Sequence, residues 1–597
     1  MCFYNWCVVM PMNSNLTVML TTEGTYPFHQ GGVSTWCDIL VKRLESVDYV
    51  IYSILMDPFV TQKFQLPPSA KLIKMPLWGT EEPSEHLETP FSENFLAKER
   101  TTAKVIDSQF LPLFRELIQQ IIGLEKDPHR LARILLDMHQ YFQQYEYKIS
   151  FKSQLTWETY KKIVLEYVDQ PANRMGRPDV YGLIQSLGWI YRFLAILNTP
   201  VPKVHVTHAS AAAFCGIPCV IAKLRDNTPF LLTEHGIYLR EQYLSLAKRE
   251  YSSFLNSFLI RMIHSVTGLS YAFADQVSPV CEYNTRWEKK FGVHPRNIQV
   301  IYNGVDKNVF IEAPRKDQPQ PTVVTVARID PLKDILTLIK CAAIVKAHVP
   351  NVKFLIYGSV SVPDYYQQCL ELREKLELQD TVIFAGHTSN VAAAYHSGDV
   401  IALTSISEAF PYSVVEAMMT GKPVVSTDVG GIREALGDTG ILVNPRDFEG
   451  LADGIIRLLK QPELRAAMGQ EARERALTHF TLGKVLEMHL KSYLRLAVRA
   501  DRPEEEPQTA ERSPARRIAR QRLFMERACA FAASGMHMDA VRHFRLAVME
   551  APSSSAVPVI LAEIAECYNK LGEYDKAFLE MEKFKAMSVL LARQDIA

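Results

Sequence analysis

The chain has 597 residues, more than one hydrophobic core usually organises, so its length predicts several domains. Hydrophobic residues make up 48% of it and charged residues 22%, which is the composition of an ordinary globular protein. The 66 basic residues equal the 66 acidic residues in number, so the charge balance argues against a nucleic-acid partner.

No uninterrupted apolar run approaches the length of about 18 residues that a membrane-spanning helix requires, so we expect no transmembrane segment. The first residues, MCFYNWCVVMPMNSN, lack the basic start and the long apolar run of a secretory signal. The ten cysteines are scattered, without a CxxC pair, which favours free thiols in a reducing compartment. We therefore expect a cytoplasmic protein, and any association with the inner membrane would come through a partner.

The chain begins with a strand, a turn and a helix. In NLTVMLTTEGTYPFHQGGVSTWCDILVKRL an apolar strand over 16–20 is followed by a Gly-rich turn and an amphipathic helix from about Val33. Residues from about 91 to 197 are mostly helical in pattern, as in FLPLFRELIQQIIGL, and we interpret them as a helical insertion in this first domain.

Short apolar runs that lead into loops resume after residue 203. They are KVHVTHAS, PFLLTEHGIY, QVSPVCEYN and IQVIYNGVD, and we interpret His208 in the first of them as a structural histidine. This rhythm of strand and helix builds a parallel sheet covered by helices on both faces. We assign residues 1–305 to an N-terminal Rossmann-like domain on the acceptor side of the molecule.

A second series of strands and helices occupies residues 306–498. Its strand-like runs are TVVTVARIDP, VKFLIYGS, TVIFAGHTS, DVIALTS, KPVVSTDVGG and GILVNPRD. Ligands of such sheets lie at the carboxyl ends of the strands, so two facing sheets place a site in the cleft between them. The fold class is therefore α/β, with two doubly wound domains in tandem.

The last part of the chain changes to helices only. Residues 499–516 read as a charged, Pro-containing linker. Residues 517–597 place small, large and terminating residues as a tetratricopeptide repeat does, and Gly535 and Gly572 stand 37 apart, close to the usual period of about 34. Two interpretations stay open: a docking surface for a partner, or a helical hairpin that caps the fold.

Two glutamates in SEAFPYSVVEAM are separated by seven residues. Glu408 stands in the loop after a strand, and Glu416 stands inside the helix that begins near Pro411 and Ser413. Proline is well tolerated at a helix start because the amide hydrogen there is unpaired in any case. The free amides of AFPYS and the positive helix end favour a negatively charged ligand, while the carboxylates accept hydrogen bonds from hydroxyls.

This segment, continued by GKPVVSTDVGGIRE, closely resembles the retaining family-4 glycosyltransferases of GT-B fold, and the resemblance covers about the first 495 residues. TTEGTYPFHQGGVSTW and LTEHGIYLRE resemble more narrowly the branch that contains PelF, the cytoplasmic UDP-sugar-using transferase of Pel exopolysaccharide synthesis. The helical tail lies outside the common pattern of these transferases.

The resemblance implies how the leaving nucleoside diphosphate is held. Arg328 and Lys333 in VARIDPLKD match the basic pair of the family, and preorganised cations in a closed cleft stabilise a departing phosphate. The sequence contains no D-x-D motif for a metal, so we expect metal-free transfer. Gly31 and Gly32 would let the backbone approach phosphate closely.

The resemblance also implies which residues face the sugar and the nucleoside. Glu416 would bind the ribose hydroxyls, whereas Glu408 and the amides of Phe410 and Pro411 would face the donor sugar. His235 in LTEHG matches the histidine that the family places beside the reacting sugar. The backbone near His387 would read the base.

Each of these residues has a plainer interpretation. The Gly31–Gly32 pair fits an ordinary tight turn, Arg328 and Lys333 fit solvated charges at a helix start, and Glu416 fits a surface glutamate. Their joint occurrence, in order, at the strand ends of two tandem domains favours the functional interpretation.

The sequence therefore predicts a retaining, metal-independent hexosyltransferase that uses a nucleotide sugar, UDP-linked, and a glycan hydroxyl as acceptor, without a cofactor. A protein partner, such as a membrane export component, would bind residues 517–597. Two alternatives stay open. One is an epimerase or phosphorylase with the same architecture, and the other is a catalytically idle nucleotide-sugar-binding scaffold that acts through the tail.

Overall fold

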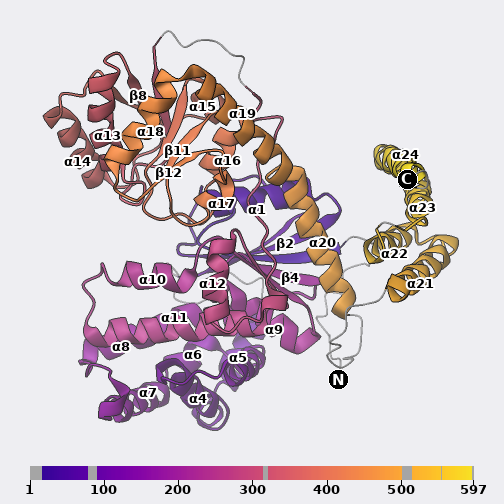
Figure 1. The fold of residues 1–597 in the computed structure, drawn as a ribbon. Helices are drawn as coiled ribbons and strands as arrows, with labels where there is room; N and C mark the ends of the chain where they lie inside the picture. The colour runs from indigo at the N-terminus through magenta and orange to yellow at the C-terminus, as the bar shows by residue number, and fades with distance from the viewer. Residues whose placement is uncertain (1–15, 78–89, 313–319, 501–513, 553, 595–597) are drawn as a thin grey trace. The chain divides into compact units, whose positions relative to one another are not determined.

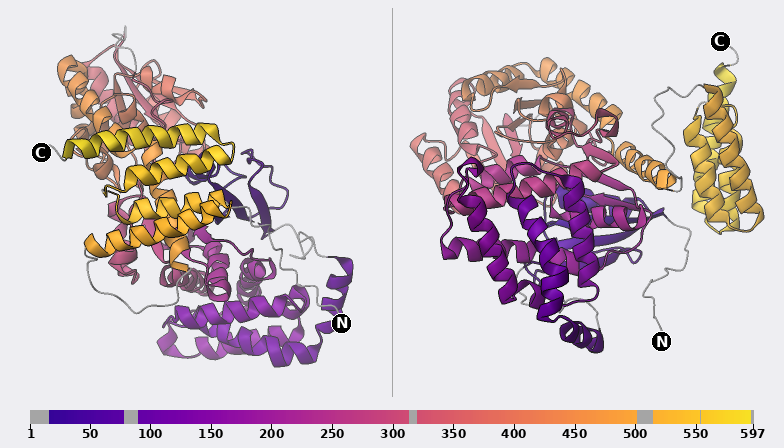
Figure 2. Two further views of the ribbon diagram at one scale, coloured as in Figure 1. Left: turned by 90° about the vertical axis from the view of Figure 1, so that its right-hand side faces the viewer. Right: turned by 90° about the horizontal axis from the view of Figure 1, so that it is seen from below.

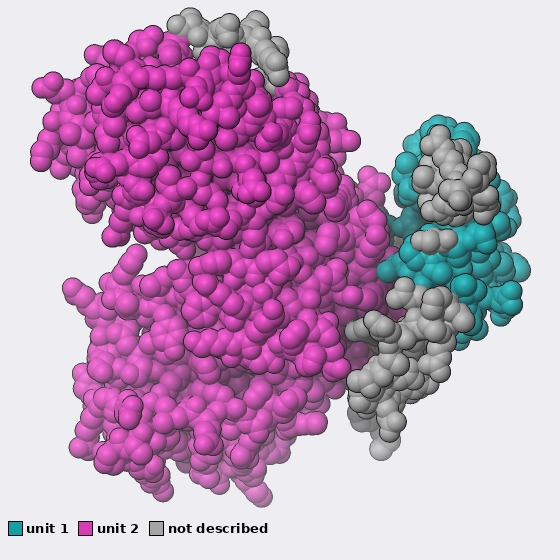
Figure 3. Space-filling model, in the orientation of Figure 1, with its two compact units in different colours: residues 1–16, 46–48, 501–597 teal, residues 17–45, 49–500 magenta. Residues whose placement is uncertain are grey.

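The computed structural model describes residues 16–77, 90–312, 320–500, 514–552 and 554–594 (Figure 1). The chain divides into two compact units (Figure 3). One unit comprises residues 17–45 and 49–500 and holds nearly all of two parallel sheets. The other comprises residues 1–16, 46–48 and 501–597 and holds the helical tail. The predicted linker, 499–516, lies mostly outside the described residues.

The first sheet has six parallel strands in the order β3-β2-β1-β4-β5-β6. Strands β4 and β5 are buried at every residue and β1 at every residue except Thr17 and Glu23, as is typical of a parallel sheet. The strands are β1 (Leu16–Glu23), β2 (Val47–Leu55), β3 (Lys71–Pro76), β4 (Val206–Ala209), β5 (Phe230–Glu234) and β6 (Gln276–Pro279).

The helices of residues 91–198 pack on the first domain mainly through the long helix α11, which contacts α4, α5 and α8, and through α9, which contacts α5. They share a single hydrophobic core with the sheet. The helical segments of this half are α1 (Gly32–Arg43), α2 (Phe91–Arg100), α3 (Ala103–Val105), η2 (Ile106–Phe110), α4 (Leu111–Ile122), α5 (Pro128–Phe142), α6 (Tyr147–Phe151), α7 (Gln154–Val168), η3 (Pro171–Asn173), α8 (Val180–Phe193), η4 (Leu194–Asn198), η5 (Phe214–Gly216), α9 (Ile217–Asp226), α10 (Tyr238–Leu246), α11 (Ser253–Phe273), α12 (Glu282–Lys290) and η6 (Pro295–Asn297).

The second sheet also has six parallel strands, in the order β12-β11-β10-β7-β8-β9. Neighbouring residues of its strands face opposite cores: Val323 belongs to one hydrophobic cluster and Val324 to the other. The strands are β7 (Thr322–Val326), β8 (Lys353–Tyr357), β9 (Val382–Gly386), β10 (Val400–Leu403), β11 (Val424–Thr427) and β12 (Ile441–Val443).

Helices cover both faces of the second sheet, α13 and α18 on one face and α16, α17 and α19 on the other. The following helix, α20, packs against β4 and β5 of the first sheet, so the chain returns to the first domain before it enters the tail. The helices are α13 (Ile335–His348), α14 (Pro363–Lys375), α15 (Val391–His396), α16 (Tyr412–Met419), α17 (Ile432–Leu436), α18 (Phe448–Lys460), α19 (Pro462–His479) and α20 (Leu482–Ala500).

Some sequence expectations need correction. The run IQVIYNGVD forms no named strand and makes two isolated bridges, Val277 with Ile298 and Val305 with Thr481, because its residues continue as a loop into the second domain. The sequence interpretation also left out β2 and β3, and it ended β1 three residues early. The eight cysteines within the described ranges are free thiols, as expected.

One helical stretch of the described residues, Val180–Asn198, has the length and mean hydropathy, 1.4, of a membrane span. Arg192 interrupts it, which is why a search for uninterrupted apolar runs did not detect it. In the structure 44% of this window is buried, and Leu183 and Ile190 belong to the hydrophobic core of the first domain.

The tail is entirely helical over its described residues, and its four helices pack in chain order, α21 on α22, α22 on α23 and α23 on α24. Figure 2 shows them side by side. Gly535 and Gly572 stand at equivalent turns with φ of +77° and +76°, a conformation that glycine adopts without strain. The helices are α21 (Pro514–Ala533), α22 (His537–Glu550), α23 (Val557–Lys570) and α24 (Tyr574–Gln594).

Candidate functional site

The predicted site residues of the second domain follow two adjacent strands, β7 and β10. The sequence order of the strands reverses between these two strands, and in open α/β sheets ligands bind in the crevice at such a point. Arg328 and Lys333 follow β7, and Glu408 follows β10. The topology therefore brings the two cations and the carboxylate to the same edge of the sheet.

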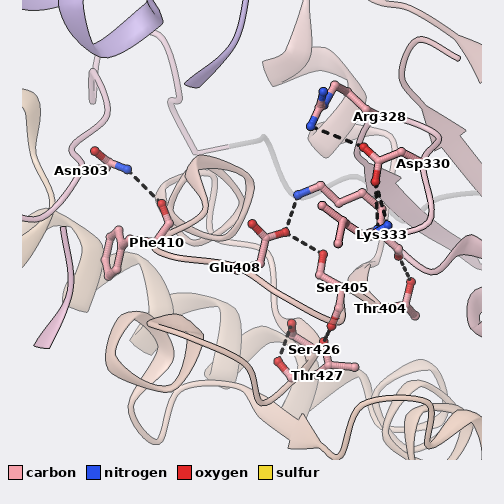
Figure 4. Close-up of polar contacts among 11 residues, drawn as sticks. Asn303, Arg328, Asp330, Lys333, Thr404, Ser405, Glu408, Phe410, Ser426 and Thr427 are labelled. Carbon is pink, nitrogen blue, oxygen red and sulfur yellow. Dashed lines mark hydrogen bonds and ion pairs between the residues drawn. The ribbon is translucent and has the colours of Figure 1, made fainter. Parts of the chain in front are cut away.

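Lys333 and Glu408 form an ion pair between the ammonium group and Oε1 of the carboxylate (Figure 4). The Ser405 hydroxyl donates to the same oxygen at 2.7 Å. Both charged side chains are largely buried, with 19% and 11% exposed. The sequence placed both residues in the site, but it did not predict that they bind each other.

Asp330 organises the loop that carries the two cations. Its buried carboxylate accepts from the backbone amides of Leu332 at 2.9 Å and Lys333 at 3.2 Å, and it pairs with Arg328 at 3.4 Å (Figure 4). The Arg328 side chain remains 64% exposed. One terminal nitrogen of the Arg328 guanidinium thus contacts Asp330, while the exposed remainder of the group can bind an incoming anion.

The loop of Glu408 depends on a glycine on the neighbouring strand connection. Gly430 has φ of +58°, and a Cβ there would lie 1.8 Å from the carbonyl oxygen of Glu408. The next residue, Gly431, donates its amide to the carbonyl of Ala409 at 2.7 Å. The two glycines of the VGG sequence therefore contact and fix the backbone at Glu408 and Ala409.

The role predicted for the Pro411 amide needs correction, whereas the role of the Phe410 amide stays a prediction. Pro411 has no amide hydrogen and donates nothing. The ring of Phe410 is buried against Tyr302 and Phe480, and its carbonyl accepts from the side chain of Asn303 at 2.9 Å. The unpaired amides at this helix start come from the first turn of α16, which contains Ser413.

Glu416 lies in α16, half-buried, and one of its oxygens accepts from the Tyr395 hydroxyl at 2.8 Å. Burial raises its pKa to about 7, and the bond from Tyr395 opposes this rise. This carboxyl therefore changes charge near neutral pH, and when ionised it can accept further hydrogen bonds.

The first domain brings its own residues to the facing side. Gly31 and Gly32 lie at the start of α1, and a Cβ on Gly32 would lie 3.9 Å from the ring of Tyr412 in α16. Arg240, in α10, donates to the Ser407 hydroxyl at 3.3 Å, next to Glu408. Within the unit that holds the sheets, the surface is hollowed between its upper and lower parts (Figure 3).

His235 follows β5 and is held edge-on against the indole of Trp36, with the ring centroids 4.7 Å apart. Burial lowers its pKa to about 3, so the imidazole is neutral at physiological pH. Its Nε2 is buried and has no hydrogen-bond partner among the described residues. A neutral ring with one unpaired nitrogen is free to bind a hydroxyl.

His387 stands apart from these residues. It is exposed and follows β9, an edge strand two positions from β7. Among the described residues no hydrogen bond or ion pair joins it to Lys333 or Glu408, so its role toward the base stays a prediction.

Glu23 is a polar group that the sequence interpretation missed. It ends β1, accepts from the Tyr238 hydroxyl at 3.0 Å and the Cys215 amide at 3.3 Å, and burial raises its pKa to about 7. Its position at the end of the first strand, within TTEGTY, is the feature of the sequence that could have identified it.

No group of three or more His, Cys, Asp or Glu side chains in the described ranges forms a metal site.

Comparison with known proteins separates the two halves. Residues 306–475 match the family model described as glycosyl transferases group 1, and residues 16–296 match one described as a domain of unknown function, DUF3492. The chain is 34% identical over 183 residues to trehalose synthase of Pyrococcus horikoshii, covering 29% of this chain and 44% of that one. It is 30% identical over 208 residues to N-acetyl-alpha-D-glucosaminyl L-malate synthase of Bacillus anthracis, covering 33% and 54%. The chain thus spans about half the length of these curated relatives.

Solved structures establish the fold. Sucrose-phosphate synthase of Thermosynechococcus elongatus superposes with a TM-score of 0.52 and 17% identity, covering 81% of this chain and 100% of that one. HepE of Anabaena, in complex with UDP, superposes with a TM-score of 0.50 and 16% identity, covering 80% and 99%. The predicted GT-B fold with two Rossmann-like domains is confirmed, and residues 306–475 are similar to the group 1 glycosyltransferases.

Proposed function

We propose that this chain is a retaining, metal-independent glycosyltransferase that moves a hexose from a UDP-linked donor to a hydroxyl of a glycan. The observation that carries the proposal is the Lys333–Glu408 ion pair beside Arg328, at the strand ends where the order of the second sheet reverses. It lies inside the segment that matches the group 1 glycosyltransferases.

The two cations suit a departing diphosphate. Arg328 presents an exposed guanidinium, and Lys333 holds its largely buried ammonium next to Glu408. A diphosphate bound here would share Lys333 with Glu408, and negative charge that develops as the glycosidic bond breaks would meet cations already in place. This arrangement needs no proton transfer to the leaving group.

The acceptor side is uncharged by contrast. His235 is neutral, with a buried, unpaired nitrogen, and it follows β5 of the first sheet. A hydroxyl acceptor needs hydrogen-bond partners and exclusion of water, because water would otherwise take the sugar. Retention of anomeric configuration rests on the resemblance to family-4 enzymes, in which the departing phosphate itself can accept the acceptor proton.

The donor is proposed to carry uridine because HepE, of the same fold, is described with UDP. Glu416 would accept hydrogen bonds from the ribose, and the loop at His387 would face the base. The resemblance to the PelF-containing branch supports a role in exopolysaccharide synthesis, with a growing polysaccharide as acceptor.

Release of nucleoside diphosphate from a panel of UDP-, GDP- and ADP-hexoses in EDTA tests the proposal. We expect turnover of one UDP-hexose, lost in Arg328→Ala and Glu408→Gln and kept in Arg457→Ala, which removes an exposed arginine of α18. An NMR spectrum of the product at the anomeric proton tests retention. Strict dependence on a divalent cation, or turnover unaffected by the first two substitutions, would contradict it.

The tail is proposed to bind a protein partner of the export machinery at the inner membrane. Helix α24 exposes Tyr574, Phe578 and Leu579, large apolar side chains that a soluble surface rarely gathers. Replacing Tyr574 and Phe578 with serine should release the chain from the membrane fraction and leave donor turnover unchanged. An unchanged amount of the chain in the membrane fraction would contradict this docking role.

Binding of a donor without turnover would favour the alternative function, a catalytically idle nucleotide-sugar-binding scaffold.

A further inference from the structure

Three rings, the indole of Trp36 and the imidazoles of His208 and His489, pack together next to His235. Trp36 of α1 lies edge-on to His235, to His208 and to His489, with centroid separations of 4.7, 5.2 and 5.5 Å. His489 comes from α20, the helix that returns from the second domain to the first sheet. One indole therefore touches the site histidine on one side and a distant helix on the other.

The hydrogen bonds of the two inner histidines differ. His208 is saturated, since its ring nitrogens bond to the Tyr493 and Thr233 hydroxyls, each at 2.7 Å. His489 accepts through Nε2 from the indole N–H of Trp36 at 3.3 Å. The other nitrogen of His489, Nδ1, is buried and has no partner among the described residues.

This arrangement is unfavourable for a residue that only fills space. An acceptor at Nε2 of a neutral imidazole places the proton on Nδ1, and a buried donor without a partner is destabilising. A leucine would fill the same volume without that cost. A histidine at this position is explained if the hydrogen bond from the Trp36 indole to its Nε2 is needed, because without that acceptor the buried indole N–H would have no partner.

The indole in turn constrains His235. The planes of the two rings meet at 72°, the edge-to-face geometry that aromatic quadrupoles favour, so rotation of the indole would remove the support on that side of the imidazole. Trp36 also lies one turn after Gly32, at the start of the same helix that opens beside Tyr412. Its orientation therefore affects the ring of His235 directly.

We propose that His489 is a positioning residue: by accepting the Trp36 indole N–H, it holds the indole so that His235 is aimed at the reacting sugar. The inference deepens the proposed glycosyl transfer and rests on it for its kinetic consequence. Burial lowers the pKa of His489 to about 3, so the ring stays neutral and keeps its acceptor at physiological pH. The second half of the chain thus orients a site residue of the first.

A double-mutant cycle on the full chain tests this link. Trp36→Phe removes the N–H but keeps a ring, and His489→Leu removes the acceptor. We expect each to lower kcat about tenfold with little change in the donor KM, and the double variant to lose no more than either. His489→Gln, whose amide oxygen can accept the same bond, should recover most of the lost kcat. Tyr493→Phe, one turn along α20, removes a hydroxyl that bonds to His208 and leaves the Trp36–His489 hydrogen bond in place, so it should stay near wild type.

A second readout does not depend on turnover. In protein labelled with 13C at histidine Cε1, the His235 resonance, identified with His235→Gln, should shift in Trp36→Phe and in His489→Leu and return with His489→Gln. Additive losses in the cycle, an unmoved His235 resonance, or an equal effect of Tyr493→Phe would overturn the positioning role. If no donor is turned over by wild type, the proposed function fails, while the resonance still decides whether His489 orients His235.

Discussion

The two sheets differ in the charge of the side chains that follow their strands. The second sheet presents ions, with Arg328 exposed and Lys333 paired to Glu408. The first presents His235, a neutral imidazole whose pKa burial lowers to about 3, and Glu23, whose carboxyl pKa burial raises to about 7. A charged leaving group and an uncharged hydroxyl make these different demands. The contrast suggests that each domain is adapted to one reactant.

The same contrast appears in how each side is held. The cations stand on a loop organised by one carboxylate, Asp330, within the second domain. His235 is instead supported by rings that come from α1 and α20, far apart in the sequence. The ionic side is assembled locally, whereas the neutral side depends on long-range packing.

The largest effect should come from Lys333→Ala. It removes a preorganised cation and leaves Glu408 largely buried without its partner, so we expect kcat/KM to fall about 10²- to 10³-fold. Steady-state kinetics with the donor found in the panel measure it. Lys340→Ala, an exposed lysine of α13, serves as the control. A loss below tenfold would mean that the second sheet does not carry the leaving-group charge.

Gly430→Ala should destabilise the protein by about 1–3 kcal/mol, because the position needs φ of +58° and the new Cβ would meet the Glu408 carbonyl. Gly268→Ala, in the interior of α11 with nothing within 4 Å, should instead stabilise it by about 0.5–1 kcal/mol. Urea unfolding of both variants gives the comparison. Equal behaviour of the two would contradict the argument from backbone conformation.

Glu416 should make stability depend on pH. Burial raises its pKa from 4.5 to about 7, so between these values the folded state holds a proton that the unfolded state has released. The stability that the protonated Glu416 carboxyl contributes is fully present below pH 4.5 and is lost as pH rises through 7. Melting temperatures from pH 5 to 8 should therefore fall less steeply in Glu416→Gln than in wild type. Parallel curves would assign the pH dependence to other groups, such as Glu23.

The smallest effect should come from Arg240→Ala. Its bond to the Ser407 hydroxyl is exposed and 3.3 Å long, and such contacts contribute little in water. We expect kcat/KM to change less than about threefold, with the change decreasing at high salt. A much larger loss of kcat/KM, measured in the same assay as Lys333→Ala, would mean that a charged side chain of the first domain contributes to activity, contrary to the comparison of the two sheets.

Local sequence predicts where the site residues lie along the chain, and the family resemblance supplies the roles proposed for them. Arg328, Lys333 and Glu408 stand in loops that follow apolar runs, and such runs form strands whose carboxyl ends share one edge. The Lys333–Glu408 pairing could not be predicted, because it depends on β7 and β10 becoming neighbours. The role of Gly430 was hidden for the same reason, since it acts on a loop from another strand connection.

Local sequence was enough to predict most of the elements, their order and the residue types after the strands, although not β2 or β3, because apolar periodicity and turn chemistry act over a few neighbouring residues. Only the tertiary structure decided that α20 returns to the first sheet and that Trp36 donates to His489. These two residues are 453 positions apart, and nothing local to either one specifies the other. Contacts of that kind arise from packing of whole elements, which the periodicity of the sequence does not encode.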